Sequence, residues 1–127
     1  MKIKNRELVS FINSQLGDKH LPVKLMFAIS ANVEEVDGKI KAYDKAKKEL
    51  IDKYAKKDEN GEPVVEGINY VFEDQDKWIN DITELLEMEV DVNIVSVTLE
   101  DIAKCDEAEF DSLTVNEISS IRFMIKE

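Results

Sequence analysis

The feature that most constrains the fold of this chain is a long stretch of helical periodicity between Pro22 and about Lys57. Apolar residues recur there at alternating spacings of four and three residues, which is a heptad seam broken once by a lysine. The seam consists of Ile29, Val33, Val36, Ile40, Tyr43, Lys47, Leu50 and Tyr54. Pro22 suits a first helical turn, and the turn-forming segment KKDENGEP ends the pattern. We therefore predict one long amphipathic helix over residues 22–57.

Such a helix is too long to lie inside a compact domain of 127 residues. It would extend about 54 Å, whereas the radius of gyration of a chain of this size is about 14 Å. Helices predicted over residues 6–16 and 75–88 together extend about 38 Å, which is too short to cover the seam. The long helix therefore bends near Gly38, packs in a projecting hairpin, or meets a second copy of the chain. We expect its end to project, which would leave Leu50 and Tyr54 available to a partner.

The rest of the chain predicts shorter elements. MKIK, the alternating segment Ile68 to Phe72 and the segment MEVDVNIVSV each read as a strand. Asn5 stands where it would cap a first helix, and Asp74 or Asp76 where it would cap a helix that carries Trp78. We predict a single domain over residues 1–127 of the α+β class, mostly helical, with a small sheet of about three strands.

Two pairs of capping residues predict the starts of two further helices. Thr98 precedes Asp101 by three residues, and Thr114 precedes Glu117 by the same spacing. A hydroxyl and a carboxylate at this spacing can each accept a hydrogen bond from the other's backbone N–H. We expect a short helix after each threonine.

Charge is divided unequally along the chain. Residues 1–72 carry 13 basic and 12 acidic side chains, whereas residues 73–127 carry 4 basic and 16 acidic ones. An acidic surface repels nucleic acid and anionic membranes and attracts basic protein surfaces. The densest run of carboxylates has two interpretations: a surface that only keeps the protein in solution, or a face that meets a basic groove, including one that normally holds nucleic acid. This face consists of Glu100, Asp101, Asp106, Glu107, Glu109 and Asp111.

Residues that often carry chemistry are isolated in this sequence. His20, the one histidine, is expected in an exposed loop, and Cys105 has acidic neighbours that disfavour its thiolate. The segments around Asp58 and Asp74 fail the spacing of calcium loops and read as turn and cap residues. No phosphate-binding loop, zinc motif or CxxC pair is present. We therefore predict no enzyme activity, no cofactor and no metal site.

The sequence also bears on where the protein acts. No apolar run approaches the length of about 20 residues that spans a bilayer, and the N-terminal segment has charges where a secretion signal is apolar. We expect a cytoplasmic protein that contacts neither membrane nor nucleic acid directly.

Three segments in this order resemble a family of small proteins of unknown function that are encoded by bacteriophages and prophages of Gram-positive bacteria. They are MKIKNRELVSFIN, then LPVKLMFAISANVEEV with the Lys/Glu-rich helix and YAKKDENGEPV, and finally ELLEMEVDVNIVSVTLEDI leading to LTVNEISSIRFMIKE. The resemblance implies a phage origin and action inside an infected bacterium, and it supplies no catalytic residues.

These observations favour a non-enzymatic protein that binds a host or defence-system protein stoichiometrically through its acidic half. A virion accessory or assembly protein that self-associates through the long helix, as a homodimer for example, is the alternative. An enzyme with a carboxylate or metal site ranks third.

Overall fold

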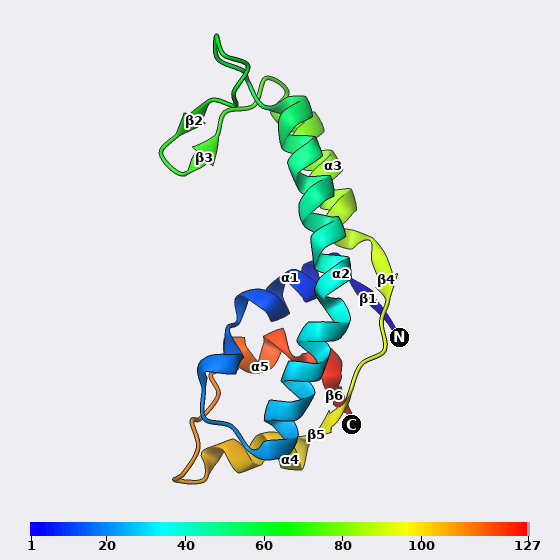
Figure 1. The fold of residues 1–127 in the computed structure, drawn as a ribbon, viewed down its shortest axis with the longest axis vertical. Coiled ribbons are helices and arrows are strands. Elements are labelled where there is room, and N and C mark those ends of the chain that lie inside the picture. The colour runs from blue at the N-terminus through cyan, green and yellow to red at the C-terminus, as the bar shows by residue number, and fades with distance from the viewer. Residues whose placement is uncertain (127) are drawn as a thin grey trace.

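The computed structural model describes residues 1–126 as a compact body from which a helical hairpin projects (Figure 1). Helix α2 (Val23–Tyr54) crosses the body and continues beyond it. Helix α3 (Gln75–Glu87) returns beside the projecting half of α2, and the strands β2 (Val65–Glu66) and β3 (Asn69–Tyr70) lie at the tip. The predicted class, α+β with mostly helical content, is confirmed.

The body is built from the two ends of the chain. Its N-terminal elements are β1 (Lys2–Lys4), α1 (Asn5–Asn13) and the 3₁₀ turn η1 (Leu16–Asp18). Its C-terminal elements are β4 (Glu89–Asp91), β5 (Val97–Thr98), α4 (Leu99–Ala103), η2 (Lys104–Asp106), α5 (Val115–Ser120), η3 (Arg122–Met124) and β6 (Ile125–Lys126). Both groups pack around the lower half of α2 (Figure 1).

The strands do not form one sheet of three strands but three separate pairs. Antiparallel β1 and β4 place Ile3 opposite Val90, and parallel β5 and β6 place Val97 opposite Ile125. The tip hairpin pairs Val65 with Tyr70 and Glu66 with Asn69. Its turn requires Gly67, whose φ of 62° is the left-handed conformation that other residues rarely adopt. Ile68, predicted within a strand, lies beside this glycine in the turn.

The long helix is confirmed to within three residues at each end, and its Tyr54 end projects as predicted. Of the three arrangements expected for the long helix, the structure shows the projecting hairpin, in which α3 lies along the part of the α2 seam that was expected to be uncovered. Leu50 and Tyr54 are consequently half-buried, and the Tyr54 hydroxyl donates a hydrogen bond to Asp81 of α3 at 2.5 Å. The α3 helix therefore covers part of the projecting end, and a partner contact at Leu50 and Tyr54 stays a prediction.

One hydrophobic core lies in the body around α2. It includes Ile3, Leu8, Phe11, Leu16, Leu25, Ile29, Val36, Val92, Val97, Ile121 and Met124. Asn32 of α2 is completely buried among these side chains. Its amide nitrogen donates to the carbonyl oxygen of Val95 at 3.0 Å, and its amide oxygen accepts from the N–H of Val95 at 2.8 Å. Both polar ends of the buried Asn32 amide therefore have hydrogen-bond partners, and these bonds hold the segment between β4 and β5 against α2.

Asn5 has a different role from the one predicted. It is buried and does not cap α1; the residue in the capping position is Lys4, whose side chain makes no capping bond. The Asn5 side chain donates instead to the carbonyl oxygen of Leu85 at 2.8 Å. The backbone N–H of Asn5 donates to the carbonyl oxygen of Met88 at 3.0 Å. The final carbonyls of a helix lack partners within the helix, so Asn5 closes the end of α3 and fixes the hairpin on the body.

Among residues 1–126, no helix combines the length and the apolar character that crossing a membrane requires.

Replacement of Asn32 by leucine should destabilise the protein strongly. The Asn32→Leu variant would leave both backbone groups of Val95 without their partner, and we expect the free energy of unfolding to fall by about 3 kcal/mol. Urea unfolding followed by circular dichroism measures this change. Asn80→Leu, on the exposed surface of α3, is the matched control and should alter stability by less than about 0.5 kcal/mol. Equal stability of the two variants would contradict the assigned role of Asn32.

Candidate functional site

The predicted acidic face lies on α4, on η2 and on the loop that follows them, at the end of the body opposite the hairpin tip (Figure 1). Glu100, Asp106, Glu107 and Glu109 are exposed. Among residues 1–126, no lysine or arginine forms an ion pair with any of these four carboxylates. They therefore present uncompensated negative charge to the solvent.

Asp101 does not belong to this exposed face. Only 8% of its surface is accessible, and its carboxylate accepts a hydrogen bond from the N–H of Thr98 at 3.0 Å. The Thr98 hydroxyl accepts in return from the N–H of Asp101 at 3.2 Å. The bond from the Thr98 backbone is the main reason that the pKa of Asp101 lies below its usual value. Asp101 caps the N-terminus of α4 together with Thr98, so we no longer include it in the surface that meets a partner.

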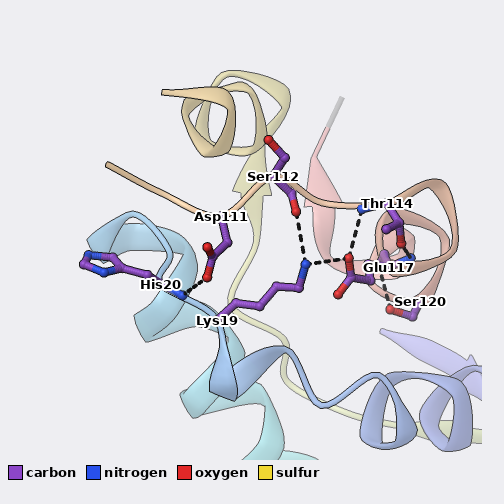
Figure 2. Close-up of polar contacts among 7 residues, drawn as sticks. All are labelled: Lys19, His20, Asp111, Ser112, Thr114, Glu117 and Ser120. Carbon is purple, nitrogen blue, oxygen red and sulfur yellow. Dashed lines mark hydrogen bonds and ion pairs between the residues drawn. The ribbon is translucent and has the colours of Figure 1, made fainter. Parts of the chain in front are cut away.

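Asp111 is exposed but is tied to the loop before α2. Its carboxylate accepts from the N–H of His20 at 2.7 Å, and its own N–H donates to the carbonyl of His20 at 2.9 Å (Figure 2). The His20 ring packs edge-on against Phe110 at 5.6 Å between centroids. His20 is exposed, as predicted, and its backbone joins the acidic loop to the rest of the body.

Lys19 makes the second attachment of this loop. Figure 2 shows its side chain reaching from the segment before α2 to the segment that leads into α5. The Lys19 ammonium donates to the carbonyl of Ser112 at 3.0 Å and pairs with the Glu117 carboxylate at 2.8 Å. Glu117 also accepts from the N–H of Thr114 at 2.9 Å and so completes the predicted capping box of α5. The Lys19 hydrogen bond is the main cause that lowers the pKa of Glu117.

Cys105 and the candidate calcium segments have structural roles. Cys105 is buried in the core, and burial raises the pKa of its thiol, as expected of an unreactive cysteine. Asp74 caps α3 by accepting from the N–H of Lys77 at 3.1 Å, and Asp58 accepts from the N–H groups of Asn60 and Glu62 in the turn. Within residues 1–126, no three His, Cys, Asp or Glu side chains are grouped so that they could hold a metal ion.

The hairpin tip carries a surface that the sequence did not reveal. A groove of about 800 Å³ lies between the β2–β3 hairpin and helices α2 and α3. Its lining includes Ile68, Tyr70, Phe72, Trp78 and Ile79. The rings of Phe72 and Trp78 stack with centroids 4.5 Å apart and planes 12° from parallel. Phe72 and Trp78 are half-buried, whereas Tyr70 is exposed.

The signal for this groove was present in the segment VVEGINYVF. It places apolar residues on both faces of a short hairpin, and one face of a two-stranded hairpin can be covered by α2 and α3 while the other stays open to solvent. The tip groove, defined by Ile68, Tyr70, Phe72, Trp78 and Ile79, is therefore a candidate functional site that the fold creates.

Loss of the Lys19 ammonium should destabilise the attachment of the acidic loop in a pH-dependent way. Because the pKa of Glu117 is lowered in the folded state, its stabilisation is complete above the ordinary glutamate pKa of about 4.3 and disappears as the pH falls through the lower folded value. We expect Lys19→Met to cost about 1 kcal/mol at neutral pH and progressively less below about pH 4.

Urea titrations at a series of pH values measure this difference. Lys41→Met is the control, because Lys41 pairs with Asp37 on the open surface of α2 and such pairs contribute little. A cost of Lys19→Met that stays constant at acidic pH would rule out Glu117 as the partner that matters.

Comparisons of this chain with protein-family models, with curated proteins and with solved structures found no match.

Proposed function

We propose that this protein acts without catalysis by binding another protein at the tip groove. The observation that carries the proposal is an open groove, lined by aromatic and aliphatic side chains together with polar ones, at the end of a hairpin that projects from the body. A projecting element can reach a surface that the bulk of the body cannot approach.

The exposure of the groove residues supports this proposal. Ile68 is 96% exposed and Ile79 is 47% exposed, and Val65 and Tyr70 beside them are also exposed. Contiguous exposed apolar surface is a common mark of a protein interface. Trp and Tyr side chains are frequent anchors of binding energy at such interfaces. The stacked Phe72 and Trp78 rings would give a partner side chain a rigid wall.

The segment that forms the tip is acidic. Between Asp58 and Asp76 the chain carries seven acidic residues and no lysine or arginine, and the groove lining itself holds one carboxylate, Glu66, and one ammonium, Lys47 of α2. A protein that docks there would offer an apolar anchor surrounded by basic residues, since opposite charges at the rim speed association and select the partner. This agrees with the basic partner expected from the acidic C-terminal half.

The acidic face at the opposite end is a second candidate contact. Glu100, Asp106, Glu107 and Glu109 are exposed and have no cationic partner in the described chain. A nucleic-acid-binding protein of a bacterial host, or a component of host defence, would present the basic groove that such a face fits. In this proposal the protein acts in the host cytoplasm, which rests on the resemblance to phage-encoded proteins.

Self-association through the α2 seam receives less support. The body and α3 pack along α2, so a dimer formed through the seam would have to displace α3 and break the hydrogen bond from Tyr54 to Asp81.

Replacement of Ile68 by glutamate should weaken partner binding. The partner is first identified by affinity capture from a Gram-positive host lysate and mass spectrometry, and its dissociation constant is then measured with the purified proteins. We expect Ile68→Glu to weaken binding at least about tenfold, as removal of a central apolar anchor does.

Two further variants separate the candidate surfaces. Val115→Glu makes the same change at another exposed position, on α5, and should leave binding unchanged. The triple variant Asp106→Lys, Glu107→Lys, Glu109→Lys reverses the acidic face. Full binding by Ile68→Glu together with loss of binding by the triple variant would transfer the contact to the acidic face. Full binding by both would refute the proposal.

A further inference from the structure

A second concave surface lies in the body, where the two ends of the chain meet. It is a pocket of about 460 Å³, lined by β1 and α1 on one side and by α5 and η3 on the other. Sites for small molecules generally have volumes of about 300–1,000 Å³. The pocket therefore has the size for a small ligand, and it shares no lining residue with the tip groove.

Positive charge is concentrated in this pocket. The chain contains two arginines, and both line it: Arg6 from α1 and Arg122 from η3. Lys2 of β1 is a third cation in the lining, and Glu7 is the one carboxylate there. In a chain of net charge −11, this excess of cations is opposite to the overall charge. Guanidinium groups form paired hydrogen bonds to the oxygens of phosphate and carboxylate groups.

The three cations differ in how far they are neutralised. Arg6 pairs with Glu87, the last residue of α3. Neither Arg122 nor Lys2 forms an ion pair with a carboxylate of residues 1–126. Arg122 and Lys2 are both exposed, so two charges of the pocket face solvent without a carboxylate partner among the described residues.

The rest of the lining suits a ligand with an apolar part. Ile3 and Phe123 contribute apolar surface, and Ser10 and Ser119 contribute exposed hydroxyl groups. The Phe123 ring packs edge-on against Phe11 of the core, with centroids 5.2 Å apart and an interplanar angle of 78°. Because the core fixes this ring, a planar group can pack against it at low entropic cost.

We propose that this pocket binds a small molecule that carries a phosphate group, with the phosphate at Arg122, Arg6 and Lys2 and the organic part against Phe123. A doubly charged phosphate uses several cations better than a single carboxylate does. This site is independent of the proposed protein-binding function, so either can fail without the other.

Nuclear magnetic resonance titration of the full chain with three probes tests the proposal. Inorganic phosphate tests the anion site, adenosine monophosphate tests the anion and organic parts together, and uncharged adenosine is the control. We expect saturable shifts of the amide signals of residues 2–10 and 119–123 with both phosphates. Binding of the monophosphate should be tighter than that of inorganic phosphate, and adenosine should have no effect at the same millimolar concentrations.

Variants at Arg122 assign the site. Arg122→Gln should weaken binding of adenosine monophosphate by about tenfold, as loss of one charge-assisted contact does, and Arg122→Lys should weaken it less. Lys104→Gln removes a cation elsewhere on the surface and should have no effect. The thermal unfolding midpoint of each variant shows whether it is folded. Absence of saturation, equal shifts with adenosine, or binding that Arg122→Gln leaves unchanged would overturn the proposal.

Discussion

The structure depends on the way in which α2 holds the segment between β4 and β5. This segment follows one strand pair and precedes another, and its residues 92–96 belong to no strand. Asn32 bonds both backbone groups of Val95, and Glu35, one helical turn further on, accepts from the N–H of Asn93 at 3.0 Å. Side chains of a helix thus replace the partner strand that this backbone lacks. These bonds fix the beginning of the C-terminal elements on α2, and Lys19 and the backbone of His20 attach the acidic loop separately.

The two halves of α2 have different surroundings, and this difference explains the groove at the tip. In the body, elements from both ends of the chain cover the helix and bury Leu25, Ile29 and Val36. Beyond Tyr43, the α3 helix and the short hairpin are its neighbours, and even the apolar side chains there, such as Leu50 and Ile51, are only half-buried. Two helices and two short strands cannot enclose all of their apolar side chains. Apolar surface therefore stays open at the tip, where a binding partner could complete its burial.

Local sequence patterns predicted most of the helices and strands, but they could not predict contacts between residues far apart in the sequence. The long helix, the first strand and the caps at Asp74, Thr98 and Thr114 rest on residues a few positions apart, so their patterns are legible in the sequence. Asn5 fits the pattern of a helix cap equally well, but its partners are carbonyls of α3, which no local spacing can indicate. For Asp101 the local pattern was correct and the second assignment was not. Its capping pattern with Thr98 was recognised, yet the same carboxylate was also assigned to the acidic face. One carboxylate that caps a helix is not free to meet a partner, and the local pattern was the better guide.

The arrangement of charge allows the three surfaces to act separately. Figure 1 shows the β2–β3 hairpin and α4 at opposite ends of a molecule organised along α2. The groove lies at the hairpin end and the acidic face at the α4 end, and the pocket of Arg6 and Arg122 is lined by elements of the body. A helix of this length extends roughly 48 Å, whereas salt screens charges beyond about 8 Å under physiological conditions. The potential at each surface is therefore set by its nearest side chains and not by the net charge of −11. An acidic protein can in this way attract a basic partner at its ends and hold an anion in its body, because the fold brings its two arginines together from opposite ends of the chain.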